Sequence, residues 1–136
     1  WQEEAARAGL SSSVRFLGFT PRIRELLAAS DVLVSPVRYE AYGLNVHEAL
    51  CRGLAVMVAR SAGIVERFDA GMSEALLPDA VTAAVLADRL RAWRGDMHGW
   101  RARASVTAAG IRERSWKAMA AEFVGVVQQV PQRIPA

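Results

Sequence analysis

The sequence predicts an α/β sandwich, in which helices cover both faces of a parallel β-sheet and further helices follow at the carboxyl end. Short apolar runs without polar alternation suit strands that are buried on both faces. Helical patterns separate these runs, and such helices supply the crossovers that parallel strands need. After Asp79 all segments have a helical pattern. The 136 residues, 52% of them hydrophobic, suffice for one compact domain with a core.

Strands and helices alternate in the first part of the chain. A helix is predicted over Trp1–Ala8. Thr20 is a predicted N-cap with Pro21 at the first helical position, and Gly53 is predicted to stop a short helix over Leu44–Arg52. Four apolar runs bounded by Gly, Pro, Ser or Asp are predicted strands: Val14–Phe19, Asp31–Pro36, Leu54–Ala59 and Glu74–Pro78.

The carboxyl-terminal part is predicted to be helical over Val81–Arg94, Trp100–Arg114 and Ser115–Val130, with a break from Gly95 to Gly99. The last helix has apolar residues at three- and four-residue spacing, a pattern typical of core packing, with a docking face for another domain as the alternative. These residues are Trp116, Met119, Phe123, Val127 and Val130. Residues 131–136, with two prolines, are predicted to be a disordered tail.

Charge and cysteine content limit the class of protein. The net charge is +3, and the basic residues are scattered rather than clustered with aromatics, so no nucleic-acid partner is predicted. An anionic ligand such as a nucleotide diphosphate is compatible with this charge. The single cysteine, Cys51, excludes an intramolecular disulfide and is compatible with the cytoplasm. No apolar stretch approaches the ~20 residues of a membrane span, and no leader of signal-peptide type opens the chain.

The loop "VRYEAYG" follows a predicted strand and leads into the helix that begins near Leu44. In open parallel sheets, ligands bind beyond the carboxyl ends of strands, where this loop is expected to lie. Gly43 lets the backbone approach a ligand closely or adopt a dihedral closed to other residues. The free N–H groups of Leu44, Asn45 and Val46 would form a site for phosphate oxygens.

Two glutamates flank this turn. Glu48 lies one turn into the helix, where its carboxylate can accept hydrogen bonds from two neighbouring hydroxyls of a ribose. Glu40 lies eight positions earlier, nearer to a group attached to the diphosphate. Two solvated charges are the alternative interpretation of the pair. His47 lies about 100° from Glu48 around the helix, so it is predicted to cap or pack rather than to react.

The stretch that contains these residues resembles the signature of the family 4 (group 1) glycosyltransferases, which reads roughly P-S-x-x-E-G-F-G-L-x-x-x-E-A-M-A-x-G-x-P-V. Here Ala41 and Tyr42 replace the usual Gly and Phe, and Leu54 replaces a Pro. "VRFLGF", "AGIVERF" and "RERSWKAMAAEF" are similar to three further segments of the family, in the same order. The signature positions that match are Pro36, Glu40, Tyr42, Gly43, Leu44, Glu48, Ala49, Leu50, Gly53 and Val56.

The resemblance implies a fold and a set of site residues. The fold is GT-B, of which residues 1–136 would form part of the Rossmann-like, three-layer, donor-binding domain. Glu40 is implied as the catalytic residue that contacts the donor sugar, and Glu48 as the ligand of the ribose. In the family sheet, two strands that this chain lacks separate the strand like Val14–Phe19 from the next one. The remaining implied donor-binding residues are Tyr42, Gly43, Leu44 and Asn45 at the diphosphate, Gly18 and Phe19 at the nucleobase, and Gly63 at the sugar.

The resemblance also implies the activity and partners of a longer, bacterial, cytoplasmic parent. It would transfer a hexose-like unit from a nucleotide-diphosphate sugar to a hydroxyl acceptor, with retention of configuration and without a cofactor or bound metal. An N-terminal acceptor domain and the cations for the diphosphate are expected upstream, so the isolated chain is expected to be inactive. Peripheral membrane association of the parent, and strand exchange or dimerisation of this chain, stay open. The alternatives are a non-catalytic nucleotide-sugar-binding or assembly module and a flavodoxin-like regulatory domain.

Overall fold

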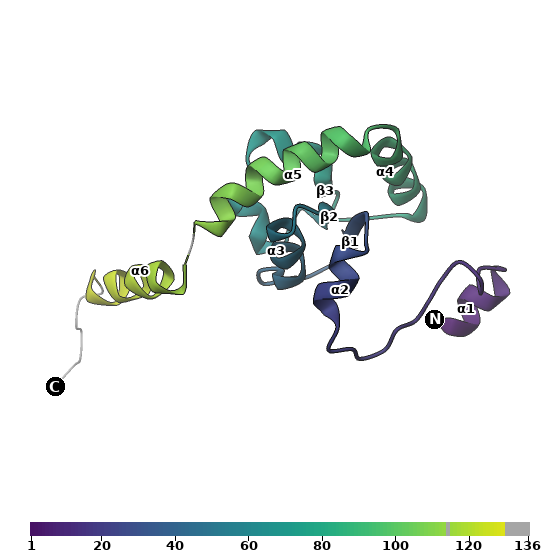
Figure 1. Ribbon diagram of the computed structural model, residues 1–136, viewed down its shortest axis with the longest axis horizontal. Helices are drawn as coiled ribbons and strands as arrows, with labels where there is room; N and C mark the ends of the chain where they lie inside the picture. Colours follow the sequence, from purple (N-terminus) through teal and green to yellow (C-terminus); the bar gives the residue numbers. More distant parts are fainter. Residues whose placement is uncertain (114, 130–136) are drawn as a thin grey trace.

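The computed structural model describes residues 1–113 and 115–129, and its centre is a parallel sheet surrounded by helices (Figure 1). The predicted α/β class is confirmed. In chain order the elements are α1 (Gln2–Arg7), α2 (Ile23–Ala28), β1 (Val32–Ser35), α3 (Leu44–Cys51), β2 (Ala55–Ala59), the 3₁₀ helices η1 (Gly63–Arg67) and η2 (Ala70–Ala75), β3 (Leu76–Leu77), α4 (Ala83–Gly95), α5 (Met97–Arg112) and α6 (Trp116–Gln129).

The sheet has the order β1-β2-β3, and both pairings are parallel. Val32 lies opposite Ala55 at one end of the first pair, and Ser35 lies opposite Val58 at the other. All five residues of the central strand are buried. Because side chains alternate between the faces of a strand, both faces of β2 are covered, which explains its unbroken apolar run. Helix α3 is the crossover from β1 to β2, so the carboxyl end of β1 leads directly into the start of α3.

The core lies where α3 and α5 pack against each other and against β2. Alanines on the buried face of α5, Ala104 and Ala108, allow this close approach between the two helices. Arg112 at the end of α5 donates from Nε (3.0 Å) and Nη2 (2.7 Å) to the Cys51 carbonyl oxygen, one of the groups that a helix end leaves unpaired. Helix α3 is therefore fixed both by its apolar face and at its carboxyl end.

The predicted strand Val14–Phe19 is wrong. The segment has no regular secondary structure and joins none of the three strands, and it runs between α1 and α2 away from the sheet (Figure 1). The Phe19 side chain is 99% exposed. A strand needs a neighbour to pair its backbone N–H and C=O groups, and β1 is an edge of the described sheet. The two intervening strands expected from the family would have to be present for this segment to pair as predicted.

Several element boundaries also differ from the prediction, three of them for a clear structural reason. Helix α2 begins at Ile23 rather than Pro21, because Thr20 Oγ1 accepts from the Arg22 amide (3.1 Å) in a turn before the helix. The predicted break from Gly95 to Gly99 shrinks to a single residue. Asp96 Oδ1 accepts from the Gly99 amide (3.0 Å), so this aspartate acts as an N-cap and α5 begins directly after it. Strand β3 has only two residues, since the 3₁₀ helix η2 extends to the residue before it.

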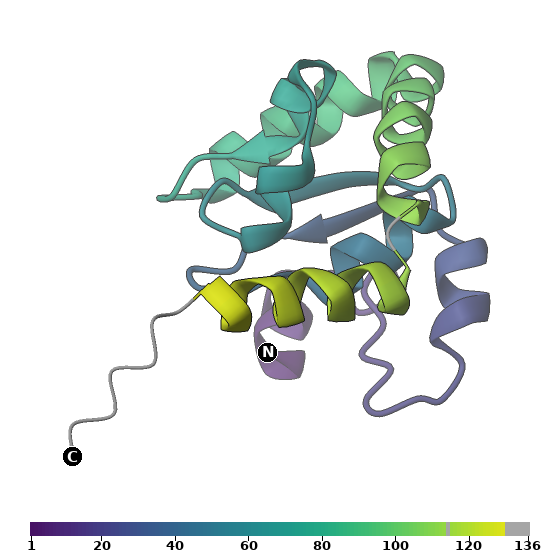
Figure 2. The same ribbon diagram turned by 90° about the vertical axis from the view of Figure 1, so that its left-hand side faces the viewer.

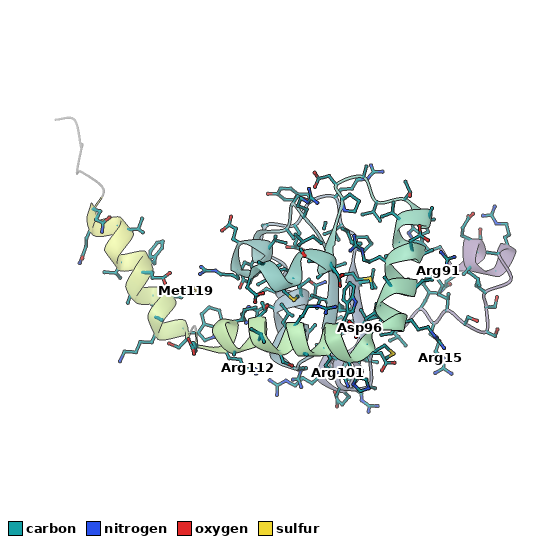
Figure 3. The ribbon with its side chains drawn as sticks, turned by 90° about the horizontal axis from the view of Figure 1, so that it is seen from above. Arg15, Arg91, Asp96, Arg101, Arg112 and Met119 are labelled. Carbon is teal, nitrogen blue, oxygen red and sulfur yellow. The ribbon has the colours of Figure 1, made fainter. Side chains whose placement is uncertain are left out.

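Helix α6 does not contribute to the core. It lies beyond the end of α5, on the side of the body opposite α1, and stands in front of the body when viewed from that side (Figures 1 and 2). Figure 3 shows α6, with Met119, continuing outward past Arg112. Trp116 is 83% and Phe123 is 70% exposed, so the core-packing interpretation of this apolar stripe is wrong for the described chain. Val130 of the stripe and the predicted tail, residues 131–136, lie outside the described residues.

Candidate functional site

The loop between β1 and α3 ends at Gly43, whose backbone is in the left-handed region (φ 103°, ψ 58°). Gly43 is the N-cap of α3, and its carbonyl oxygen accepts from the His47 amide (3.0 Å). A Cβ atom at this position would lie 3.2 Å from Cγ2 of Ile64. Both the dihedral angle and the contact favour glycine, as the sequence predicts. The bend therefore turns the chain from the end of β1 into the start of α3.

The first turn of α3 is only partly open. The Leu44 and Asn45 amides donate to no group among the described residues, and both residues are exposed. The third amide predicted to be free is not: Val46 N–H donates to Asn45 Oδ1 (2.9 Å). Asn45 Nδ2 also donates to Ser35 Oγ (3.4 Å) at the end of β1. Its side chain thus joins the start of the helix to the end of the strand and leaves two amides for a ligand.

Glu40 is held by the turn that it precedes. Its carboxylate accepts, through Oε1, from the Tyr42 amide (3.3 Å), and its carbonyl oxygen accepts from the Gly63 amide (3.4 Å). The residue is half-buried. These contacts restrict the direction of the carboxylate before any ligand arrives.

Glu48 is exposed on α3, three residues after Asn45 and therefore on the same face of the helix. Because Asn45 reaches Ser35, this face is the one near the carboxyl end of β1. His47 is half-buried and faces another side of α3. The helix thus presents the acidic residue and the imidazole in different directions.

Gly63 is the residue that lets η1 meet the loop. A Cβ atom at this position would lie within van der Waals overlap of the Ala41 carbonyl oxygen and 3.3 Å from Tyr42 Cα. Directly after it, the Ile64 amide donates to the Tyr42 carbonyl oxygen (2.7 Å). The two backbones are therefore in contact at Gly63. A contact between Gly63 and a sugar stays a prediction.

Two adjoining cavities lie beside this loop. One, of about 480 Å³, is lined by the predicted residues Tyr42, Leu44 and Gly63 together with Trp116 at the start of α6. The other, of about 530 Å³, extends toward the end of α5. Both are also lined by three residues that the sequence analysis did not single out as site residues, namely His47, Glu66 and Arg67. Glu66 could have been found, because it is the glutamate of the "AGIVERF" turn.

Six predicted site residues line neither cavity, and two of them, Gly43 and Asn45, belong to the turn at the start of α3. Glu40 and Glu48 line neither of the two. Gly18 and Phe19 lie in the segment between α1 and α2 and also line neither cavity. The roles of all six stay predictions.

Residues 1–113 and 115–129 contain no group of three or more His, Cys, Asp or Glu side chains placed to hold a metal ion. The expectation that no metal is needed stays a prediction. None of the helices in this part of the chain is both long and apolar enough to cross a membrane.

A glycine-bounded helix start at the carboxyl end of a parallel strand is typical of Rossmann-like ligand-binding domains. Residues 1–96 match the family model described as "Glycosyl transferases group 1". This match covers more than half of the chain, which therefore belongs to the group 1 glycosyltransferase family. The match also counts against the flavodoxin-like alternative.

Similar proteins of known name support the same family. The chain is 36% identical over 92 residues to the putative glycosyltransferase EpsF of Bacillus subtilis, covering 68% of this chain and 22% of the relative. It is 36% identical over 73 residues to LpsB of Rhizobium meliloti, a lipopolysaccharide core biosynthesis mannosyltransferase, covering 54% of this chain and 20% of the relative. The chain thus spans about a fifth of the length of these relatives.

Solved structures show the same fold. Anabaena HepE in complex with UDP superposes with a TM-score of 0.77 at 22% identity, covering 95% of this chain and 36% of that one. HepE in complex with UDP and glucose gives a TM-score of 0.81 at 23% identity, with 95% and 35% covered. The Rossmann-like α/β domain expected for a GT-B protein is confirmed.

Proposed function

We propose that this chain binds the nucleotide-diphosphate sugar of a retaining glycosyltransferase, whose parent transfers the sugar to a hydroxyl acceptor. The observation that carries the proposal is the start of α3. There, two amides that donate to no described residue follow a left-handed glycine, after the loop from the carboxyl end of β1, in a chain of the group 1 family. HepE, which has the same fold, was crystallised with UDP and with UDP and glucose, and this supports a nucleotide and a sugar as the two parts of the ligand.

The diphosphate would lie at the amides of Leu44 and Asn45. These N–H groups point out of the helix start and carry its partial positive charge, which favours phosphate oxygens. Their contribution to catalysis would be electrostatic, because they would stabilise charge that develops on the leaving diphosphate as the glycosidic bond breaks. Cations supplied by the parent would add to this effect.

The two glutamates would act on the two sugars of the donor. Glu48, on the face of α3 near the end of β1, would accept hydrogen bonds from the ribose hydroxyls. Glu40, whose carboxylate is already directed by the Tyr42 amide, would contact the transferred sugar. The parent would be a cytoplasmic enzyme with an acceptor domain outside this chain, it would need no bound metal, and the chain alone would show no turnover.

Isothermal titration of the chain with UDP and with UDP-glucose tests this proposal. Glu48→Gln should weaken both ligands by about 10-fold, because a hydrogen bond to a charged group is lost. Glu40→Gln should weaken UDP-glucose by a similar factor and leave UDP unchanged. Glu3→Gln, on the exposed helix α1, is the matched control and should bind like the unmodified chain. Binding of neither ligand, or glutamine variants at 40 and 48 that bind as the control does, would contradict the proposal.

A further inference from the structure

A hydrogen bond joins the donor loop, which is residues 36–43 between β1 and α3, to the side of α3. The Tyr42 hydroxyl and His47 Nδ1 are 2.9 Å apart, and the two ring centroids are 5.8 Å apart at an interplanar angle of 46°. We propose that His47, acting through Tyr42, is a positioning residue that fixes the direction of the Glu40 carboxylate toward the donor sugar. This inference rests on the function proposed above, and neither residue is required to touch reacting atoms.

Tyr42 is held at three points. Its amide donates to Glu40 Oε1 (3.3 Å), its carbonyl oxygen accepts from the Ile64 amide (2.7 Å), and its hydroxyl bonds to His47 (2.9 Å). The first two bonds fix the peptide groups on either side of the residue. The third fixes the ring, so the ring cannot change rotamer without breaking it. The side chain of Tyr42 therefore keeps the peptide groups of the loop in one orientation.

The Glu40 carboxylate depends on that orientation. Its donor among the described residues is the Tyr42 amide, so a rotation of this peptide group would remove the contact that directs the carboxylate. The Glu40 carbonyl bond to the Gly63 amide is long, at 3.4 Å, and restrains the loop weakly. The bond between the Tyr42 hydroxyl and His47, at 2.9 Å, is shorter than this bond to Gly63.

His47 is the rigid end of the bond. It lies on α3, whose Val46 and Leu50 side chains are fully buried and whose carboxyl end is held by Arg112. A helix fixed in this way does not move to follow a loop, so the bond transmits order from α3 to Tyr42. In the tautomer with the proton on Nε2, Nδ1 accepts from the tyrosine hydroxyl.

The hydroxyl of Tyr42 is a departure from the family signature. The usual residue at position 42 is phenylalanine, which has no hydroxyl to donate. Here a hydroxyl and an imidazole nitrogen are both half-buried, and each satisfies the other. Loss of either would leave a polar group in the wall of the cavity without its partner.

Binding of UDP and UDP-glucose to four variants of the chain tests the proposal. Tyr42→Phe and His47→Leu should each weaken UDP-glucose by about 3- to 10-fold, the range expected for one lost hydrogen bond, and weaken UDP less, because UDP lacks the sugar that Glu40 would contact. His47→Asn, which keeps an acceptor near the place of Nδ1, should restore part of the affinity for UDP-glucose. Tyr39→Phe is the matched control, because Tyr39 lies in the same loop and is 87% exposed.

The double variant Tyr42→Phe/His47→Leu separates a pair from two independent residues. If the hydroxyl and the imidazole act only on each other, the double variant should be no weaker for UDP-glucose than the weaker single variant. Effects that simply multiply would overturn the proposal. Equal losses for UDP and UDP-glucose, together with a lower free energy of unfolding, would also overturn it, because they would show a general structural role.

Hydrogen exchange of the ligand-free chain gives a readout that needs no donor. The Ile64 amide should exchange about 3- to 10-fold faster in Tyr42→Phe and in His47→Leu, because the carbonyl that accepts from it is less well ordered. If the Ile64 amide exchanged in both variants at the rate measured for Tyr39→Phe, the proposal would be overturned. Faster exchange in a chain that binds neither UDP nor UDP-glucose would contradict the proposed function and leave the ordering of the loop by this pair standing.

Discussion

A methyl group added at Gly63 should push the donor loop away from η1. The Cβ atom of Gly63→Ala would overlap the Ala41 carbonyl oxygen and lie 3.2 Å from the Ala41 carbonyl carbon. Both are backbone atoms, so no side-chain rotation relieves the overlap, and the loop must move by about 1 Å, as happens when extra volume is forced into a packed site. The 2.7 Å bond from the Ile64 amide to the Tyr42 carbonyl oxygen would lengthen or break. We expect a loss of about 1–3 kcal/mol in the free energy of unfolding.

Urea denaturation and UDP-glucose titration of Gly63→Ala measure the two consequences. The urea concentration at the midpoint of unfolding should fall, and the dependence of the free energy of unfolding on urea concentration should not change. The affinity for UDP-glucose should fall because the displaced loop carries Glu40. Gly110→Ala is the matched control, since a Cβ atom there meets nothing within 4 Å and Gly110 lies inside α5. It should gain about 0.5–1 kcal/mol from helix propensity. A Gly63→Ala chain as stable as the unmodified one, with the same affinity, would refute the reasoning.

Two further substitutions test the supports of α3. Gly43→Ala should lower the free energy of unfolding by about 1–3 kcal/mol, because alanine is strained at φ 103°; urea denaturation measures the loss, and unchanged stability would show that the turn can relax. Arg112→Ala should cost about 1 kcal/mol by removing the hydrogen bonds to the Cys51 carbonyl, whereas Arg101→Ala, an exposed arginine of the same helix, should not. Equal midpoints of thermal unfolding for Arg112→Ala and Arg101→Ala would contradict the capping role of Arg112.

The sequence predicts those elements whose own residues determine their structure. The run Leu54–Ala59 is apolar throughout, and it is the buried central strand. Gly53 follows the end of α3, as a helix-stopping glycine should. In contrast, Val14–Phe19 has the composition of a strand but lacks a paired neighbour in the described chain, which composition alone does not reveal. The apolar stripe of α6 has the spacing of a core helix, yet spacing does not say which surface buries it.

The candidate site is predicted in part for the same reason. Gly43 could be identified because it meets a local backbone requirement at the start of α3. Gly63 comes from the resemblance, because its contact with Ala41 depends on how distant segments fold together. The bond from the Val46 amide to the Asn45 side chain could not be predicted, because it depends on the rotamer of Asn45. The bond between Tyr42 and His47 depends on how the loop folds back onto α3, and neither residue type indicates it alone.

The most direct test of the central claim is a titration of the isotope-labelled chain with UDP-, GDP- and ADP-linked sugars, followed through the backbone amide resonances of Leu44 and Asn45. We expect at least one of these donors to shift both resonances in a saturable way, because its diphosphate would accept from these two N–H groups. Resonances that stay in place with all of the donors, while the spectrum shows a folded chain, would contradict the claim that the start of α3 binds the diphosphate.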